Sequence, residues 1–344
     1  MSAAESGGLP PETPLEKALR VAVIVPVHNA AAYLNECLAS VAAQSHQNLL
    51  CLLVENGSTD ASAGLCAHFA ARDPRFTLLR VTTAGPGAAR AAGLRAAAGR
   101  ADYIAFADAD DLCHPRLLAA LLHAATGAGL PLACCRFAPF TAAPGPNLPP
   151  PADYAVLRAP DHCRALLHDK RMDYSLCNKL YRADHITPEL LDNGYRYNED
   201  LYANWQIFRG AAGAAFCDFV GYHYRQHGGS ASHRAHSPES ITQQREIAAR
   251  IRGEAAGTPC AEAANSFYYE KLTYLASMIL RRRDAAPYAA PLDELAAALR
   301  EGLDDPALGK NPALPRGIRL AALATVHCRG PYRLLCRALL RDRQ

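Results

Sequence analysis

Apolar runs and amphipathic segments alternate from the start of the chain's first third. Residues 21–25 form an apolar, mostly β-branched run that ends at Pro26, which predicts a buried strand. Residues 33–41 carry apolar side chains at three- and four-residue intervals, which predicts a helix with Asn29 as a candidate N-cap. The chain therefore opens with a strand followed by a helix.

The same alternation continues through three more candidate strands, residues 49–54, 76–81 and 103–107. An amphipathic segment around Phe69 separates the first two, and an alanine-rich helix over residues 88–98 precedes the third. Repeated β-α-β units predict an α/β fold with a mainly parallel sheet, helices on both faces and right-handed crossovers. Ligands of such sheets bind beyond the carboxyl ends of the strands, where the polar clusters of this chain lie.

The second half of the chain does not continue this regular alternation of strands and helices. Residues 139–151 contain six prolines and predict a surface loop or a seam between subdomains. Residues 241–283 predict a helix with an apolar stripe that includes Phe267, Leu272 and Ile279. We therefore expect a flexible leader over residues 1–18, a catalytic domain over residues 19–235 and a helical C-terminal region over residues 236–344.

Composition narrows the class of protein. Half of the residues are apolar and a fifth are charged, as in a globular protein. The 36 basic and 33 acidic residues give a net charge of +3, which provides no strong field for nucleic acid. The twelve cysteines are scattered without CxxC pairs, which favours reduced, buried thiols.

The ends of the chain bear on its location. The leader lacks the basic-then-apolar pattern of a signal peptide, and no apolar stretch reaches the ~20 residues that span a bilayer. We expect a cytoplasmic protein, with the inner face of the membrane as an alternative site. From Arg316 onward, arginines alternate with apolar residues and Asp342 is the only acid. That region predicts either an interfacial helix or a helix packed on the catalytic domain with its arginines in water.

The sequence Asp108-Ala109-Asp110-Asp111 follows a predicted buried strand directly. Unpaired buried charges are costly, so this cluster needs cations or solvent. From an extended backbone Asp108 and Asp110 point the same way, which suits one hard divalent ion, Mg²⁺ or Mn²⁺, that bridges phosphates. The alternative is an exposed acidic turn in which Asp111 caps a helix that starts at Pro115.

Six motifs in order resemble the signatures of glycosyltransferase family 2, over roughly residues 21–230. They are Val23-Ile24-Val25-Pro26-Val27-His28-Asn29, Glu55-Asn56-Gly57-Ser58-Thr59-Asp60, Asp108-Ala109-Asp110-Asp111, Asn178-Lys179-Leu180-Tyr181, Tyr197-Asn198-Glu199-Asp200 and Tyr222-His223-Tyr224-Arg225. The resemblance implies a GT-A fold, a nucleotide-sugar donor, a divalent metal and inversion at the anomeric carbon.

The resemblance also implies a set of site residues. The loop Gly85-Pro86-Gly87 would approach the donor, Arg225 would grip a phosphate, and His227 would complete the metal shell. The implied donor-binding residues are Pro26, Val27, His28, Asn29, Glu55, Asn56, Gly57, Ser58, Gly87, Arg90, Asp108, Ala109 and Arg225, and the implied metal ligands are Asp108, Asp110 and His227.

Three positions depart from the family's usual residues. His28 replaces a tyrosine, Asn56 replaces an aspartate that faces the base, and Ala91 replaces an asparagine. Since Asn56 keeps an acceptor and adds a donor, a UDP-linked sugar is the expected donor while another base stays open.

An inverting transfer needs a carboxylate that takes the proton of the acceptor hydroxyl, and the resemblance assigns this role to Asp200 with Glu199 beside it. The alternative is that both are first-turn acids stabilised by a helix N-terminus. Trp205, with Tyr202 and Phe208, fits the core better than a sugar platform. Lys179 is either solvated or part of the substrate wall.

The sequence therefore predicts a glycosyltransferase with a glycan or lipid-linked hydroxyl acceptor, and the resemblance points to bacterial surface polysaccharide or lipopolysaccharide synthesis. A sugar-phosphate nucleotidyltransferase is the alternative enzyme, but the segment after the first strand is neither glycine-rich nor cationic. A non-catalytic sugar-nucleotide-binding homologue is a third reading, which the retention of Asp108, Asp110 and Asp200 disfavours.

Overall fold

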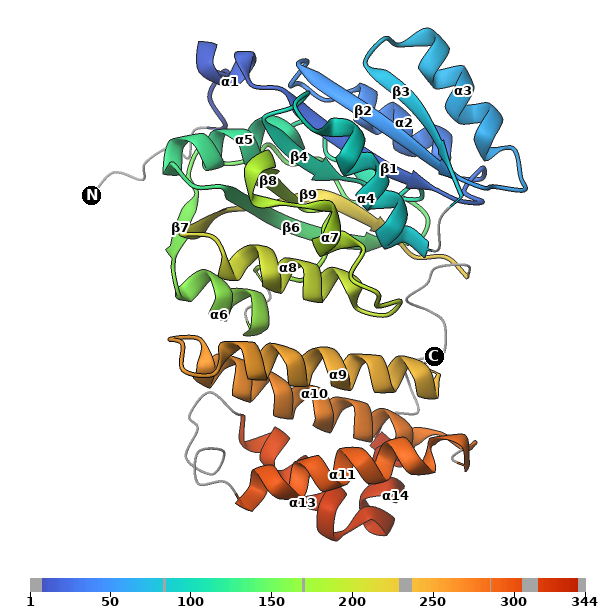
Figure 1. Cartoon of the computed structure of the whole chain (residues 1–344), viewed down its shortest axis with the longest axis vertical. Helices are drawn as coiled ribbons and strands as arrows, with labels where there is room; N and C mark the ends of the chain where they lie inside the picture. Colours follow the sequence, from blue (N-terminus) through green and yellow to red (C-terminus); the bar gives the residue numbers. More distant parts are fainter. Residues whose placement is uncertain are drawn as a thin grey trace. The chain divides into compact units, whose positions relative to one another are not determined.

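The computed structural model describes residues 8–82, 85–168, 171–228, 237–284, 286–304 and 315–339, which divide into two compact units. The first unit holds the described residues up to Tyr195 and those from Glu199 to Gly228. The second holds Arg196–Asn198 and the described residues from Ser237 onward. The first unit is a sheet covered by helices, and the second is entirely helical apart from its loops (Figure 1).

The sheet of the first unit has nine strands among the described residues. Its parallel half consists of β3 (Phe76–Val81), β2 (Leu49–Asn56), β1 (Val21–Val27) and β4 (Tyr103–Phe106), in that order. Beyond β4 the pairing is mixed, because β8 (Lys179–Arg182) runs antiparallel to both β4 and β6 (Leu132–Phe140). The predicted α/β fold, with a mainly parallel sheet flanked by helices, is confirmed.

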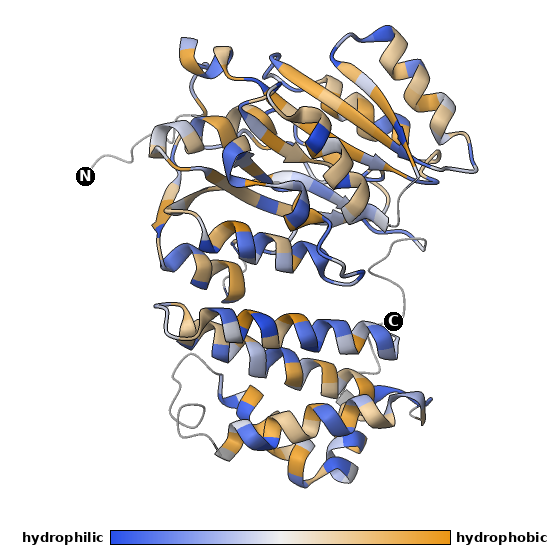
Figure 2. Ribbon diagram, viewed as in Figure 1, coloured by the Kyte–Doolittle hydropathy of each residue, from blue (hydrophilic) through white to orange (hydrophobic). Residues whose placement is uncertain are grey.

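The long strand β9 (Gly213–Arg225) lies parallel to β6 and carries two short antiparallel partners, β5 (Leu112–Cys113) and β7 (Ala155–Arg158). Through β5 it reaches the acidic segment that follows β4. The central strands are apolar along nearly their whole length, as Figure 2 shows for β2, because both faces of the sheet are covered.

The helices of the first unit occupy most of the connections between strands. They are α1 (Pro14–Ala18), α2 (Leu34–Ala42), α3 (Ser62–Arg72), α4 (Gly85–Ala97), α5 (Leu117–Ala128), α6 (Asp161–His168), the short η1 (Ala183–His185), α7 (Pro188–Leu191) and α8 (Glu199–Arg209). The predicted strands and helices of residues 21–107 are thus all present, with ends that differ by a few residues.

Four local predictions were wrong. Gly85-Pro86-Gly87 is the first turn of α4 and not a loop, since Pro86 is suited to a first helical turn. Asn29 does not cap α2, whose N-cap is Tyr33. Asp111 does not cap α5, which starts after Arg116 and has no side-chain cap.

The fourth wrong prediction is the flexible leader over residues 1–18. The part of it that the structure describes contains α1, which begins with a capping box between Thr13 and Glu16. Leu9 and Glu16 are buried. Residues 1–7 lie outside the described residues.

The second unit consists of α9 (Pro238–Ala255), α10 (Ala261–Arg281), the short η3 (Ala286–Tyr288), α11 (Ala289–Asp304), α13 (Arg316–His327) and α14 (Arg329–Leu339). Residues 241–283, predicted to be helical, lie mostly in two helices separated at Gly257, which has a left-handed φ of 73°. Phe267, Leu272 and Ile279 are buried as predicted. None of the described helices is both long and apolar enough to span a bilayer.

Two further predictions are confirmed within the described residues. Of the predicted irregular segment 139–151, residues 141–150 contain no helix or strand, whereas residues 139–140 end β6 and Pro151 forms an isolated bridge with Gly8. All twelve cysteines are free, and all of them except Cys328 are buried. Burial raises the pKa of most of these thiols, for example that of Cys66 to about 12, so they stay protonated at neutral pH.

Gly93 lets α4 lie directly on the central strands. A Cβ at this position would lie 2.5 Å from Cγ2 of Ile24 and 3.0 Å from Cγ2 of Val54, on β1 and β2. Both partners are fully buried and have no room to retreat. The close packing of α4 therefore requires glycine here.

We expect Gly93→Ala to lower the free energy of unfolding by about 1–3 kcal/mol, because overpacking forces α4 away from the sheet. Denaturant unfolding measures the effect. The matched control is Gly64→Ala on α3, where a Cβ meets nothing within 4 Å and helix propensity favours alanine. Equal changes in stability for both variants would contradict this account of the packing.

Candidate active site

The candidate site lies where three parallel strands end. Val27 of β1 pairs in register with Glu55 of β2, and Ile24 of β1 pairs with Phe106 at the end of β4. The loops that follow these strands therefore leave the sheet at the same edge. They carry His28 and Asn29, Asn56 to Asp60, and Asp108 to Asp111 respectively.

The loops after β1 and β2 are cross-linked by hydrogen bonds. His28 Nδ1 lies 2.8 Å from the carbonyl oxygen of Asn56. The Asn29 amide donates to Ser58 Oγ at 3.2 Å, and the Thr59 amide donates to Asn29 Oδ1 at 2.8 Å. Asn29 adopts a left-handed φ of 51°, which asparagine tolerates better than most residues. Its role is thus to join the two loops.

Glu55 and Gly57 shape the second of these loops. Glu55 is buried, and its Oε1 accepts a hydrogen bond of 2.6 Å from the Ser58 amide. Gly57 has a left-handed φ of 67°, which glycine adopts without strain. Pro26 and Val27 are the last two residues of β1, directly before the first of these loops.

Arg90 of α4 links two acidic groups that are far apart in sequence. Its Nη2 lies 2.7 Å from Asp108 Oδ1, and its Nη1 lies 3.4 Å from Glu199 Oε1. Burial is the largest influence on Arg90 and by itself would lower its pKa, but the charge of Asp108, the hydrogen bond to it and the charge of Glu199 are among the effects that together raise the pKa well above the usual value. The guanidinium is therefore permanently charged and holds the two carboxylates together.

Asp111 is the most buried member of the acidic segment, with 1 % of its surface exposed. Its Oδ2 accepts a hydrogen bond of 2.8 Å from the Tyr222 hydroxyl, and its Oδ1 accepts one of 2.7 Å from the Arg225 amide. The same hydroxyl accepts a hydrogen bond of 3.0 Å from the Asp108 amide. Asp111 and Tyr222 together fasten the acidic segment, including the nearly buried Ala109, to β9.

Arg225 is buried among groups of the first unit. Its guanidinium lies 4.9 Å from the ring centre of Tyr33 and 4.6 Å from that of Phe140. Its Nε donates to the Asp110 carbonyl oxygen at 2.8 Å, and its Nη2 lies 2.5 Å from Glu36 Oε2. In this conformation Arg225 packs against the two aromatic rings and holds the backbone of the acidic segment at Asp110.

Asp110 and His227 form the exposed end of the site. Asp110 Oδ2 lies 2.9 Å from His227 Nε2, and the imidazole lies 4.6 Å from the ring of Tyr33. Two of the three side chains predicted as metal ligands, Asp110 and His227, therefore face each other, whereas the third, Asp108, faces Arg90.

The chemistry of this donor set fits a divalent ion of the Mg²⁺ or Mn²⁺ type. The described residues hold no group of three or more His, Cys, Asp and Glu side chains arranged for a metal ion. Mg²⁺, however, is commonly held by one or two carboxylates together with substrate phosphates and water, and Mn²⁺ also accepts imidazole. Asp110 and His227 thus suit an ion that the phosphates of a ligand help to hold.

Glu199 and Asp200 form the first turn of α8, as one of the sequence alternatives predicts. Burial, followed by the charge of Glu199, raises the pKa of Asp200 to about 7. Burial also raises the pKa of Glu199, although the charge of Arg90 opposes that change. Asp200 Oδ1 accepts a hydrogen bond of 2.8 Å from the Leu201 amide. A carboxylate with a pKa near neutrality is suited to proton transfer.

Two predicted residues have packing roles. A Cβ on Gly87 would lie 2.6 Å from the carbonyl oxygen of Leu191, so glycine is needed there to let α4 meet α7. Both interpretations of Lys179 were wrong, because this lysine is neither solvated nor on a wall. It is 1 % exposed, and its Nζ donates to the Ser175 carbonyl oxygen at 2.6 Å and to Asn178 Oδ1 at 2.9 Å.

Trp205, Tyr202 and Phe208 are buried behind the first turn of α8, so the core interpretation is confirmed. The sequence analysis gave no role to Tyr33, Glu36 or the hydroxyl of Tyr222. Tyr222 belongs to a motif of the resembled family, but no periodicity indicates that its hydroxyl meets Asp111, 111 residues away.

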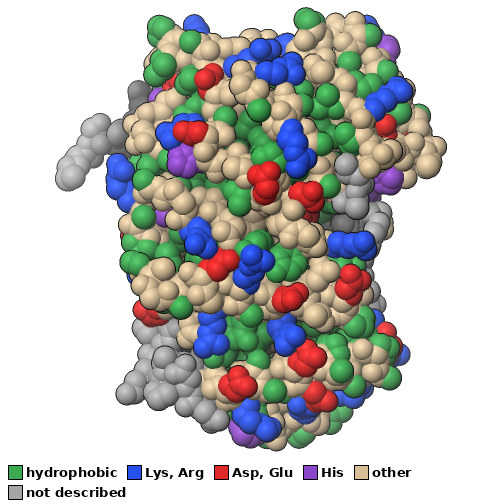
Figure 3. Space-filling view, in the orientation of Figure 1, with side chains coloured by type: hydrophobic (Ala, Val, Ile, Leu, Met, Phe, Trp, Pro, Cys, Tyr) green, Lys and Arg blue, Asp and Glu red, His purple; other side chains and the backbone are tan. Residues whose placement is uncertain are grey.

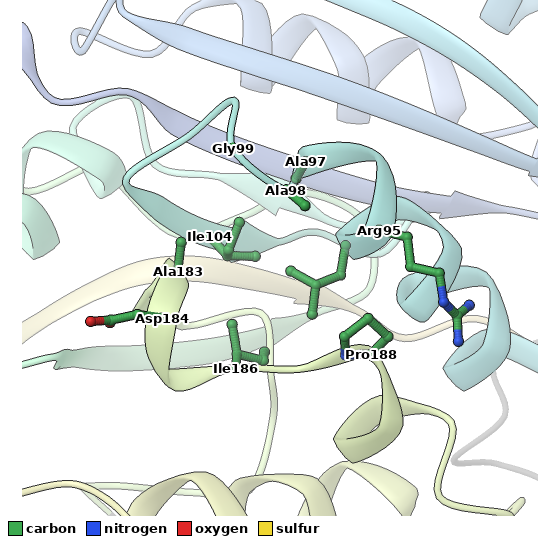
Figure 4. Close-up of a pocket in the computed structure, with 10 residues that line it drawn as sticks. Arg95, Ala97, Ala98, Gly99, Ile104, Ala183, Asp184, Ile186 and Pro188 are labelled. Atoms are coloured by element: carbon green, nitrogen blue, oxygen red, sulfur yellow. The ribbon is translucent and has the colours of Figure 1, made fainter.

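A hollow elsewhere in the first unit contains none of the predicted site residues. It has a volume of about 460 Å³ and lies between the C-terminal end of α4, β4, η1 and α7. Figure 4 shows Ile104, Ile186 and Pro188 on its walls, with Arg95 and Asp184 at its sides. Arg90, in contrast, lies in the N-terminal half of α4.

Comparison with known proteins identifies relatives of the chain. Two Bacillus subtilis (strain 168) proteins that carry the name glycosyltransferase are similar in sequence. EpsH is 30% identical over 213 residues, which are 60% of this chain and 61% of EpsH. The uncharacterized EpsJ is 28% identical over 223 residues, which are 63% of this chain and 64% of EpsJ. The match therefore spans less than two thirds of either relative.

Among solved structures, S. aureus TarS 1-349 has a similar fold. The complex of TarS with UDP gives a TM-score of 0.62 at 19% identity and covers 95% of this chain and 92% of that one. The complex with UDP-GlcNAc gives a TM-score of 0.59 at 18% identity, with 93% and 91% covered. At this identity the likeness concerns the fold, and it confirms the expected GT-A architecture.

The family model described as glycosyl transferase family 2 matches residues 22–186, which include the loops after β1, β2 and β4 and most of the first unit's sheet. Residues 22–186, which carry these loops, are therefore similar to glycosyl transferase family 2.

Proposed function

We propose that this chain is a glycosyltransferase that inverts the anomeric centre of a nucleotide diphosphate sugar, with a UDP-linked sugar as the first candidate donor, and transfers the sugar to a hydroxyl group. The acceptor we propose is a glycan or lipid-linked glycan of a bacterial surface polysaccharide or lipopolysaccharide. The transfer reaction rests on the chemistry of the first unit's site, and the class of acceptor rests on the resemblance to the family.

The observation that carries the proposal is the juxtaposition of two carboxylate groups with different tasks. Asp108 and Asp110 lie at the end of β4, where phosphates and a cation would gather. Arg90 connects Asp108 to Glu199, the neighbour of Asp200 on α8. A residue with a pKa of about 7 therefore lies close to the group that would orient the donor.

In the proposed reaction, Asp200 accepts the proton of the acceptor hydroxyl as its oxygen attacks the anomeric carbon. A carbon–oxygen bond to the acceptor forms, and the bond to the diphosphate breaks with its electron pair on the leaving nucleoside diphosphate. Attack from the face opposite the leaving group inverts the configuration. Arg90 keeps Glu199 and Asp108 in place, and the aromatic core behind α8 fixes the helix that carries the base.

Asp110 and His227 are the residues that would hold Mg²⁺ or Mn²⁺, with Asp108 nearby. When bound, such an ion would neutralise the charge that develops on the diphosphate. The UDP preference is supported by the TarS complexes with UDP and UDP-GlcNAc, whose fold is similar. Asn56 and His28 stand at the loops where a base would bind.

We expect Asp200→Asn to retain the fold and donor binding but to lower turnover at least ~10²-fold, the usual contribution of a general base. Because only the unprotonated carboxylate accepts a proton, the wild-type rate should rise with pH through the pKa of about 7 and then level off. Release of UDP from UDP-N-acetylglucosamine and other UDP-sugars, measured against pH, tests this.

The companion variant is Glu199→Gln. The charge of Glu199 raises the pKa of Asp200, so its removal should move the rise in rate to lower pH. Near wild-type turnover in Asp200→Asn, with binding unchanged, would transfer the role of base to another group, with Glu199 as the first candidate. Release of pyrophosphate from a nucleoside triphosphate and a sugar 1-phosphate, with no UDP released from the UDP-sugars, would indicate a nucleotidyltransferase.

We expect turnover to stop in chelator and to return on addition of Mg²⁺ or Mn²⁺, and Asp110→Ala and His227→Ala to need much more metal for the same rate. The control is Asp184→Ala, which removes an exposed carboxylate that pairs with Arg182 away from the site. Full turnover in chelator, or an unchanged metal requirement in Asp110→Ala, would refute the metal role.

We expect Tyr222→Phe to lower kcat/KM for the donor at least ~10-fold, because the buried Asp108 amide and Asp111 carboxyl lose their shared partner. Donor titrations of turnover measure this. Tyr181→Phe is the matched control, since it also removes a buried hydroxyl, bonded to Asn204 at 2.8 Å outside the acidic segment. If both variants lose stability equally and turnover equally, Tyr222 has no specific positioning role.

A further inference from the structure

The C-terminal helices of the second unit expose large apolar side chains to solvent. On α13, Leu320 is 67% exposed and Leu323 is 41% exposed. On α14, Leu334 is 69% exposed and Leu335 is 51% exposed. Four large apolar side chains exposed on two consecutive helices suggest a surface that a partner covers.

These leucines lie on the outward faces of helices whose inward faces are already packed. Ala322, Thr325 and Val326 are the buried residues of α13. On α14, Cys336 is buried, and the Tyr332 hydroxyl lies 2.9 Å from Ser277 Oγ of α10. The outward leucines are therefore not needed for the internal packing of the second unit.

The residues around these leucines are basic. Residues 315–339 contain five arginines, namely Arg316, Arg319, Arg329, Arg333 and Arg337, and no aspartate or glutamate. Arg316 is exposed, Arg329 pairs with Asp293 of α11 at 2.5 Å, and Arg337 donates to the Arg282 carbonyl oxygen at 2.6 Å. On α14 the arginines recur every four residues along one side, next to the exposed leucines.

Figure 3 shows apolar and basic side chains exposed together over the region where Figure 1 draws α13 and α14. Acidic side chains are also visible there, and within the described residues they come from other elements, since residues 315–339 have none. Leucines flanked by arginines and free of acids within two consecutive helices match the composition of helices that lie in a membrane interface.

We propose that α13 and α14 form a docking surface for an anionic phospholipid membrane, with Leu320, Leu323, Leu334 and Leu335 inserted among the acyl chains and the arginines at the headgroups. The leucines supply apolar area for burial, and the arginines complement the negative lipid charge. An uncharged apolar partner would not explain the arginines, and a nucleic acid would not explain the leucines.

This surface acts independently of the sugar chemistry, so its failure would leave the proposed transfer reaction intact. It does extend that reaction, because a protein held at an anionic membrane meets lipid-linked acceptors at high local concentration. No helix needs to cross the bilayer for this contact, which uses one face of each helix.

The test is flotation of the full-length protein with vesicles of phosphatidylcholine, either pure or with about 30 % phosphatidylglycerol. The phosphatidylglycerol gives the vesicles a negative surface. We expect the protein to float with the anionic vesicles and to stay at the bottom with pure phosphatidylcholine. Raising the salt concentration should release it, because salt screens the arginine contribution.

Two matched pairs of variants locate the contact. Leu320→Ser with Leu334→Ser should lower the partition coefficient by about tenfold or more, since each leucine loses its apolar burial. The control, Leu15→Ser with Leu148→Ser, changes leucines that are 63% and 68% exposed in the first unit. Arg316→Glu with Arg333→Glu should weaken binding about tenfold or more, whereas Arg72→Glu with Arg100→Glu, of equal net charge, should not.

Several outcomes would overturn the proposal. One is that the intact protein does not float with anionic vesicles at low salt. Another is that the control pairs lose as much binding as the test pairs. Light scattering, which measures the oligomeric state, can give a further contradicting outcome. If the intact protein is a dimer that does not float, and Leu320→Ser with Leu334→Ser makes it monomeric, the leucines serve contact between two copies of the chain.

Discussion

The geometry of the site depends on the buried carboxyl group of Asp111. It receives hydrogen bonds from the Tyr222 hydroxyl and the Arg225 amide, and Tyr222 in turn holds the Asp108 amide. Burial, followed by the charge of Asp108, raises the pKa of Asp111 to about 8. The acidic segment after β4 is thereby attached to β9, a strand that follows it by more than a hundred residues of chain.

This attachment separates carboxylates that would otherwise repel one another. Asp108 turns to Arg90, Asp110 turns to His227, and Asp111 turns inward to β9. Each acid of one short segment thus has a different partner, supplied by a different part of the first unit. Charge is therefore distributed over α4, β9 and the residues after it.

The sequence predicts the elements of residues 21–107 because buried parallel strands and amphipathic helices leave clear local patterns. It does not predict that Arg225 stacks on Tyr33 and pairs with Glu36, 189 positions earlier, because no local pattern encodes contacts of that separation. Asn29 looked like a cap because caps and left-handed loop residues favour the same side chains. Lys179 looked exposed because lysine usually is, and three polar neighbours make its burial tolerable here.

The distribution of thiols has a practical consequence. All twelve cysteines lie in the described residues, and Cys328 alone among them is exposed, at the junction of α13 and α14. A maleimide dye added to the native, unmodified chain would therefore attach almost exclusively at that junction, since buried thiols react slowly. The wild-type protein carries a built-in attachment point for an environment-sensitive fluorophore, placed between its two arginine-rich helices.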